Sequence, residues 1–432
     1  MSTARGLRMG AALLWTSLCV AQAPTPARKL TLAEAEQIAI KNHPRIRAAK
    51  LTALAAEAVT TQVRAAYYPT LSGNLTAVGA APNTAVSAGN VTTSSLFSRA
   101  ASGIVVNQLL TDFGRTSNLE KSAQLKAQAQ NENAGDVHAQ ILLQVHSAYY
   151  QALSAQAVLK VARETVAARQ VSLRQVSELA RNQLKSSLDV SFAEVYLSEA
   201  ELLLFRAENE IEAALTNLSA AMGYASTQSF ELTDEPMPAP LDPNPESEVK
   251  KALVSRPDLA SARLQRDAAV KLAQGERRLA FPTISALGVA GLIPAREEKL
   301  HSRYAGAGVN MSIPVFNGGL FSARRNEAEL KAQAAAGELS DLELRVARDV
   351  KVAWLNANNA FRQLAVTTRL QEQASRSMRL AQSRYELGLS SIVEITQAQL
   401  NKTDAEITNA RAGYQYQIQR AILDFQIGAL RR

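Results

Sequence analysis

Cysteine is nearly absent from this chain, since Cys19 is the only one among 432 residues. It lies in an N-terminal segment with an apolar run from 9 to 20 and the tripeptide Ala21-Gln22-Ala23, a pattern typical of a signal peptide. We therefore expect residues 1–23 to be removed on export, which leaves a mature chain without thiols. Disulfides, cysteine nucleophiles and sulfur-ligated metals are then excluded. Lipidation of Cys19 is disfavoured, because Leu18 stands where a small residue is needed.

Long apolar runs and catalytic motifs are also missing. Beyond residue 23 no stretch of about 18 apolar residues remains, so we expect no transmembrane helix, and passage through a bilayer would require strands. The formal charge of +8 is spread without a basic patch, which argues against nucleic-acid binding. No P-loop, nucleophile elbow or HExxH motif is present, and His138 and His146 are too far apart on one predicted helix to share an ion. We expect no enzyme activity, no cofactor and no metal.

The chain does contain an internal duplication. The segment Ala123–Ala129 (AQLKAQA) returns 205 residues later as Ala328–Ala334 (AELKAQA). The same offset relates further pairs: Gly114 and Gly319, Val145 and Val350, Tyr149 and Trp354, and Asp189 and Glu394. We therefore expect a first repeat over 24–224, a proline-rich linker over 225–247 and a second repeat over 248–432.

A heptad pattern of small and apolar residues dominates each repeat. It comprises Ile141, Val145, Ala148, Ala152, Ala155, Leu159, Ala162 and Val166 in the first repeat, and Val346, Val350, Ala353, Ala357, Ala360 and Leu364 in the second. This spacing predicts left-handed supercoiling against a partner helix, and the alanines predict close approach. Because neither 115–180 nor 320–385 contains proline, we expect two continuous helices about 100 Å long.

Each long helix is followed by a turn after which the chain reverses. Ser186 with Asp189, and Ser391 with Glu394, have the spacing of a capping box, in which a serine and an acidic residue satisfy each other's backbone N–H groups. The return helices are expected to end near Met222 and Ile427. Each repeat would thus contribute a long antiparallel helical hairpin.

Before each hairpin the periodicity changes to two residues. Small or apolar residues alternate with polar ones over 71–77 and 305–313, which predicts strands, and less regular partner strands are expected near 102–110 and 284–292. The uncharged segment 80–98 is typical of an exposed loop. Each chain would therefore supply four strands in two hairpins, placed between long helices.

Four strands cannot close a barrel, because about eight are needed to enclose any volume and more for a water-filled lumen. Lipid cannot satisfy unpaired strand edges, so such a chain would share a barrel with copies of itself. Two copies would give eight strands, and three would give twelve around a lumen. The alternative is an exported structural coiled coil, or a periplasmic adaptor-like scaffold without a pore, and an enzyme is more remote. The strand hairpins favour the pore, since a scaffold has no use for them.

In this order, the elements and motifs resemble the TolC-like outer-membrane efflux proteins over about residues 28–430. The resemblance rests on the duplicated unit and on the following motifs: Pro69-Thr70 and Pro282-Thr283, Asp112-Phe113-Gly114-Arg115 with Asn317-Gly318-Gly319, and Tyr385-Glu386-Leu387-Gly388-Leu389 followed by Ser391 and Glu394. It implies a mainly α protein with a membrane β-barrel: a homotrimer whose twelve-stranded barrel lies in outer-membrane lipid and continues into a periplasmic α-helical tunnel. It also implies a passive exit duct for efflux or type I secretion, which works with a periplasmic adaptor and an inner-membrane pump.

The resemblance also assigns roles to the hairpin turns. Glu394 falls where the family has an acidic constriction ring, and Asp189 and Tyr385 fall where a hydrogen bond holds the entrance shut. The adaptor-docking tip would comprise Leu184, Ser186, Ser187, Leu188, Gly388, Leu389, Ser390 and Ser391. Two departures imply fewer closing contacts: Ser390 replaces an arginine that ties subunits together in some members, and Gln397 replaces a second acidic ring.

Simpler roles remain open for these residues. Asp189 and Glu394 also suit helix N-termini, where free N–H groups and the helix dipole favour carboxylates. Tyr385 also suits an ordinary packing position. Gln183 stands where the second turn has Gly388, so we expect the two turns to differ in backbone geometry.

Overall fold

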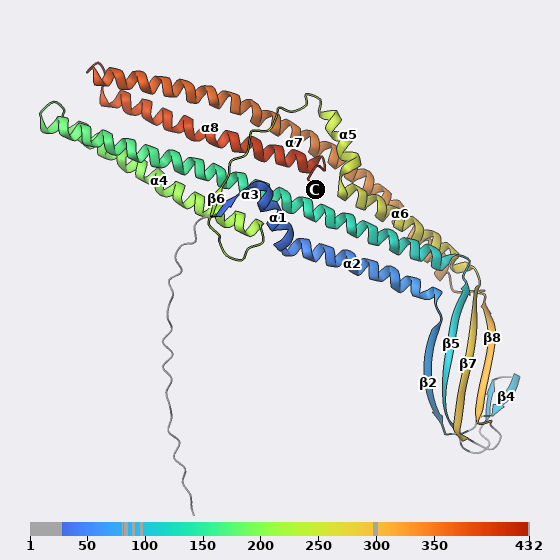
Figure 1. Ribbon diagram of the computed structural model, residues 1–432. Helices are drawn as coiled ribbons and strands as arrows, with labels where there is room; N and C mark the ends of the chain where they lie inside the picture. Colours follow the sequence, from blue (N-terminus) through green and yellow to red (C-terminus); the bar gives the residue numbers. More distant parts are fainter. Residues whose placement is uncertain are drawn as a thin grey trace, which may run out of the picture.

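The computed structural model describes residues 28–79, 81, 85–88, 91–95, 98–296 and 301–430. The signal peptide expected over 1–23 lies outside these residues. The molecule is elongated, with a four-stranded sheet at one end and the turns of two helical hairpins at the other (Figure 1). Within the described ranges, no helix combines the length and the hydropathy needed to cross a membrane.

Two helices of equal length run through most of the molecule. They are α3 (Arg115–Arg181) and α7 (Leu320–Glu386), each of 67 residues, which confirms the two long helices that were predicted. The return helices α4 (Ser187–Ala221) and α8 (Ile392–Gln426) pack along α3 and α7 and have 35 residues each. Each return helix therefore covers only about half of its long partner, on the side of the turn (Figure 1).

Shorter helices cover the half of each long helix that leads to the sheet. In the first repeat these are α1 (Leu32–Asn42), α2 (Pro44–Arg64) and the 3₁₀ turn η1 (Ala65–Tyr67). In the second they are α5 (Pro245–Ser255), α6 (Pro257–Arg277) and η2 (Arg278–Ala280). Pro44 and Pro257 occupy the first turns of α2 and α6, where their missing N–H groups cost no hydrogen bond. Because α6 contacts both α3 and α7, it joins the two repeats.

The four predicted strands form one antiparallel sheet in the order β2-β5-β7-β8. Their bounds are β2 (Thr70–Val78), β5 (Arg99–Thr111), β7 (Thr283–Arg296) and β8 (Arg303–Ser312). The two hairpins meet at the β5–β7 pair, in which Val105 lies opposite Val289. The first repeat therefore supplies one half of the sheet and the second repeat supplies the other.

Four further short strands were not predicted. The segment expected to be a loop over 80–98 contains the hairpin of β3 (Ala85–Ala88) and β4 (Val91–Ser95), so that expectation was wrong there. β1 (Arg28–Leu30) pairs in parallel with β6 (Phe230–Leu232), which lies inside the predicted linker. Strands of three residues are too short to show periodicity, and pairing across about 200 residues leaves no local signal.

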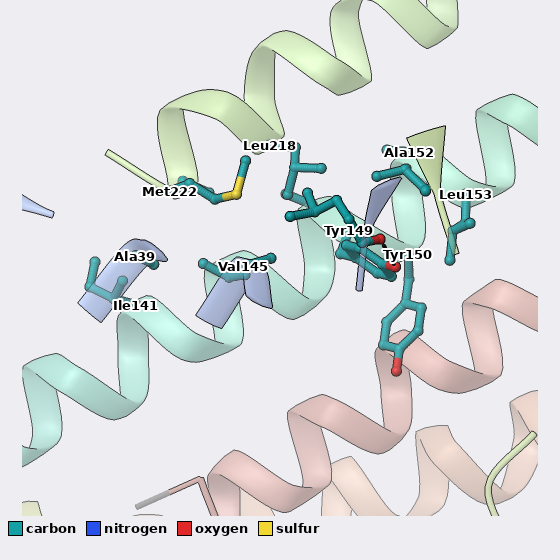
Figure 2. Packing of buried hydrophobic residues seen from close by; sticks show 14 of the residues in the cluster. Ala39, Ile141, Val145, Tyr149, Tyr150, Ala152, Leu153, Leu218 and Met222 are labelled. Carbon is teal, nitrogen blue, oxygen red and sulfur yellow. Dashed lines mark hydrogen bonds between the residues drawn. The ribbon is translucent and has the colours of Figure 1, made fainter. Parts of the chain in front are cut away.

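Most heptad positions lie in the core. Ile141, Val145, Ala152, Val350 and Ala357 are fully buried, and the first three pack with residues of α1 and α4 in one cluster (Figure 2). The equivalent alanines of α7 pack with α5 and α8 in a second cluster. Alanine at these positions lets the helix backbones approach closely.

Equivalent aromatic residues fix the linker and the N-terminal strand at mid-length. The Tyr149 hydroxyl on α3 lies 2.9 Å from the carbonyl oxygen of Leu30 and 2.6 Å from that of Thr233. Trp354, its counterpart on α7, donates from Nε1 to the carbonyl oxygen of Asp242 at 2.9 Å. The aromatic residues at this duplicated position therefore hydrogen-bond different parts of the chain: Tyr149 bonds the backbone at Leu30 and Thr233, and Trp354 bonds the linker at Asp242.

The bends from strand to long helix require left-handed backbone. Phe113 and Gly114 have φ of 54° and 90°, and Gly318 and Gly319 have φ of 60° and 84° at the second bend. In the first bend, the Asp112 carboxylate accepts hydrogen bonds from the N–H groups of Gly114 and Thr116 at 3.2 and 2.7 Å. The Asp-Phe-Gly-Arg motif is thus a bend with a helix cap.

Candidate functional site

One face of the sheet is apolar and exposed. The register places Leu71, Leu75, Ile104, Val106, Leu292, Val309 and Met311 on it. Their exposed fractions range from 36% for Val106 to 89% for Leu75. The same face carries Ser102 and, at its end farthest from the helices, Arg303. A mainly apolar surface of this kind needs an apolar neighbour, and it is typical of the outer face of a membrane sheet.

The opposite face is mainly polar or small. It carries Thr70, Ser72, Asn74, Val105, Asn107, Ser285, Leu287, Val289, Tyr304, Gly306, Gly308, Asn310 and Ser312. Such a face suits contact with water. The alternation seen in the sequence over 71–77 and 305–313 therefore separates an apolar side from a water-facing side.

Both edges of the sheet are open within the described residues. β2 and β8 are its first and last strands, and each pairs with a single neighbour. Strands of nine and ten residues with free N–H and C=O groups invite further pairing. The sheet of one chain is thus incomplete.

The two hairpin turns lie together at the other end of the molecule (Figure 1). Gln183 and Gly388 have φ of 61° and 71°, and both turns are closed by equivalent bonds, from Leu184 N–H to the Leu179 carbonyl and from Leu389 N–H to the Arg384 carbonyl. The expectation that the turns would differ was therefore wrong. Glutamine adopts the same left-handed conformation at a cost of roughly 1 kcal/mol.

The predicted docking residues are mostly exposed at these turns. Leu184, Leu188 and Leu389 expose 61–69% of their surface, and the neighbouring Leu387, which was not among the predicted residues, exposes 73%. Ser186, Ser187, Gly388 and Ser391 are exposed as well. Only the Ser390 hydroxyl is enclosed, and it has no hydrogen-bond partner among the described residues. The turns therefore present an apolar tip.

Asp189 and Glu394 occupy equivalent positions but have different partners. In the first repeat the capping box is complete: Ser186 N–H donates to Asp189 Oδ2 at 3.0 Å, and Asp189 N–H donates to Ser186 Oγ at 3.2 Å. In the second, the Glu394 N–H donates to Ser391 Oγ at 3.3 Å, but the Glu394 carboxylate lies 3.4 Å from Arg384 Nε. The predicted second box is thus only half formed.

Tyr385 lies where the two hairpins meet. Its ring packs on a cluster that includes Val176 and Ile392, and its enclosed hydroxyl has no hydrogen-bond partner among the described residues. Lys185 Nζ sits 4.4 Å from the centre of the ring, close enough for a cation–π interaction. The structure thus brings Tyr385 to Lys185, and no hydrogen bond joins it to Asp189 in the described part of the chain.

Sequence reasoning did not single out Lys185 or Arg384. Both belong to the turns, but their partners depend on how the two turns lie in space, and the motif spacing carries no signal for that. Among the described residues, no group of three or more His, Cys, Asp or Glu side chains is placed to hold a metal ion. His146 instead contacts the carboxylate of Glu36 on α1.

Comparison with solved structures defines the class of fold. The outer-membrane channel OprN superposes with a TM-score of 0.78 at 20% identity, covering 93% of this chain and 91% of that chain. The outer membrane protein VceC from Vibrio cholerae gives 0.75 at 15% identity, covering 92% and 96%. The chain therefore has the fold of these outer-membrane proteins, mainly helical with a small sheet.

A family model described as outer membrane efflux protein matches residues 36–224 and 249–429. The chain belongs to this family, and it is a bacterial outer-membrane protein with a helical extension on the periplasmic side. It is 26% identical over 305 residues to the solvent efflux pump outer membrane protein SrpC of Pseudomonas putida, covering 69% of this chain and 64% of that protein. It is 24% identical over 311 residues to the probable outer membrane lipoprotein SilC of Salmonella typhimurium, covering 69% and 65%. These matches span slightly less than two thirds of the relatives' own length.

Proposed function

We propose that three copies of this chain form a passive exit duct of the outer membrane. The observation that carries the proposal is the incomplete sheet, which has one exposed apolar face, one water-facing face and two open edges. Pairing β8 of one copy with β2 of the next satisfies both edges, and three copies give twelve strands around a lumen. The apolar face then contacts lipid.

The helical hairpins continue the duct on the periplasmic side. α3 and α7 begin directly at the ends of β5 and β8, so three copies gather six long helices around the axis of the barrel. Neither a structural coiled coil nor an adaptor-like scaffold needs an exposed apolar sheet face. The exposed leucines of the hairpin tips would serve as the docking surface for a periplasmic adaptor, which connects the duct to an inner-membrane pump.

Cargo choice belongs to the pump in this scheme. Relatives are named for solvent efflux, toluene efflux and pyoverdine export, which are chemically different cargoes. A passive duct is compatible with chemically different cargoes, because a wide aqueous lumen discriminates only weakly between solutes.

The closed entrance would be held at the hairpin tips. Glu394 would form the constriction ring, with Arg384 beside it, and Tyr385 would hold the second hairpin against the first. Its contact with Lys185 and its packing in the tip cluster support this role. Asp189 would contribute by fixing the start of α4 through its capping box.

Edge-to-edge pairing can be tested by cross-linking. Thr70 and Ser312 lie on the two edge strands at the end of the sheet near the helices. In the mature chain, which has no cysteine of its own, we expect Thr70→Cys combined with Ser312→Cys to give covalent dimers and trimers in detergent, and neither single variant to give trimers. The purified trimer should also conduct ions in planar bilayers. A water-soluble monomer that neither cross-links nor conducts would refute the proposal.

A further inference from the structure

Tyr304 lies across the water-facing surface of the sheet. The register places it in one row with Gly291 on β7, Gly103 on β5 and Asn74 on β2. The end of its ring fills the space of the two missing side chains, because a Cβ on Gly291 would meet Tyr304 Cζ and a Cβ on Gly103 would overlap the Tyr304 hydroxyl oxygen. The backbone is close as well: these Cβ atoms would also meet the carbonyl oxygens of Ser102 and Ala290, respectively. The ring therefore spans from β8 over β7 to β5.

Only some glycines of the sheet make room in this way. Gly308 belongs to the same strand and the same face as Tyr304, yet a Cβ there would have nothing within 4 Å, and the same holds for Gly73 on β2. The absence of side chains at Gly103 and Gly291 thus leaves a bed, a flat stretch of backbone on which the Tyr304 ring packs. A tyrosine seated on backbone keeps its outer surface free, and Tyr304 remains 38% exposed.

The position of Tyr304 in the duct follows from the topology. It is the second residue of β8, at the end of the sheet farthest from the helices (Figure 1). A concavity of about 870 Å³ lies at this level. Its lining includes Asn74 and Tyr304, and also Leu75, Ile104, Leu292 and Arg303 from strand positions of the apolar face. The row of Tyr304, Gly291, Gly103 and Asn74 itself holds no charged side chain and offers an aromatic surface beside an amide, with Arg303 next to it in the lining.

We infer that Tyr304 is a contact site for planar aromatic solutes on the lumen wall, near the outer mouth of the duct. This inference rests on the proposed function, which turns the water-facing surface into the lumen wall and places three such rings at one height. An aromatic ring supported from behind presents its free surface to stacking partners, and such pairs add to plain apolar contact. An uncharged, non-aromatic solute gains nothing comparable from it.

Current block in planar bilayers tests the inference. The probe is caffeine, an uncharged planar aromatic solute, and mannitol is the non-aromatic control of similar size. We expect Tyr304→Ala to weaken the apparent affinity for caffeine block roughly two- to tenfold, as lost stacking would do. Tyr304→Phe should keep the wild-type block, and mannitol should not distinguish the three proteins.

A matched pair of glycine variants tests the seating of the ring. Gly103→Ala should push the ring into the lumen and lower the open-channel conductance, whereas Gly308→Ala should leave conductance at the wild-type level. Equal caffeine block in wild type and Tyr304→Ala would overturn the inference while leaving the duct intact. Wild-type protein without any conductance would instead refute the proposed function, and this inference with it.

Discussion

If the chain forms the proposed duct, the ion pair between Arg384 and Glu394 predicts how its entrance would select ions. The two side chains are 57% and 44% exposed with Nε and Oε1 3.4 Å apart, so the pair stabilises the fold by less than about 1 kcal/mol. Its importance lies in charge. In a trimer, three carboxylates at the constriction would face three guanidinium groups, and the wild-type ring would be close to neutral.

Replacing either Arg384 or Glu394 by a neutral residue leaves the charge of the other one unbalanced. A unit charge roughly 5 Å from a permeating ion contributes about 0.8 kcal/mol in water, so three contribute about 2.5 kcal/mol before screening by salt. We therefore expect Glu394→Gln to make the channel anion-selective and Arg384→Gln to make it cation-selective, with permeability ratios changed by roughly tenfold or more at low salt. Melting temperatures should barely change.

Reversal potentials across a potassium chloride gradient measure this directly. Arg411→Gln is the control, because Arg411 forms a similarly exposed pair with Glu210, at 3.2 Å, between α8 and α4 and away from the tip. It should leave the reversal potential unchanged. If both tip variants also match wild type, Glu394 faces away from the pore and serves only its helix N-terminus.

Three further predictions concern stability. Ala152→Leu and Ala357→Leu should each lower the free energy of unfolding by about 1–3 kcal/mol through overpacking, seen as a lower melting temperature, because both alanines are fully buried; unchanged melting would contradict the packing. Tyr149→Phe should cost roughly 1–2 kcal/mol and expose the N-terminal strand to proteases, since the carbonyl groups of Leu30 and Thr233 lose the one hydroxyl hydrogen that they share. Burial, and next the positive charge of Lys50, lower the pKa of His138 in the folded protein below its ordinary value of 6.5. As the pH drops through about 6.5, the unfolded chain therefore binds a proton at His138 before the folded protein does, and the free energy of unfolding falls. Burial also lowers the pKa of His43, so His138→Gln should reduce, and not abolish, that loss in melting curves from about pH 7.5 to 5.5. Equal slopes for wild type and variant would show that His138 does not contribute.

The sequence was most informative where side-chain periodicity extends over many residues. The heptads over 141–166 and 346–364, together with the absence of proline over 115–180 and 320–385, located both long helices to within about a residue. Alternation identified β2 and β8 clearly. The alternation was less regular in β5 and β7, because the pairing between these two strands shifts register next to Ala100 and again next to Leu109. Each shift interrupts the alternation between faces.

The candidate site was less accessible to sequence reasoning. Spacing alone identified Ser391 and Glu394 as a capping box, but the carboxylate turns to Arg384 instead, and only the folded turn brings that guanidinium within reach. The contact of Lys185 with Tyr385 joins residues 200 positions apart from different hairpins. The bed beneath Tyr304 likewise depends on the register of three strands, which no single segment encodes.

The helices that pack beside α3 and α7 are interrupted at mid-length, whereas α3 and α7 are continuous, and this difference has a mechanical consequence. α3 and α7 are unbroken rods, whereas the segments beside them change there from α1 or α5 to α4 or α8 (Figure 1). The part of each rod paired with a 35-residue return helix is a lever arm of roughly 52 Å. Tilting that arm by about 10° swings its end by roughly 9 Å without breaking a single helical hydrogen bond. In the proposed trimer, a slight adjustment of packing at mid-length would therefore be enough to widen an entrance formed by six such helices.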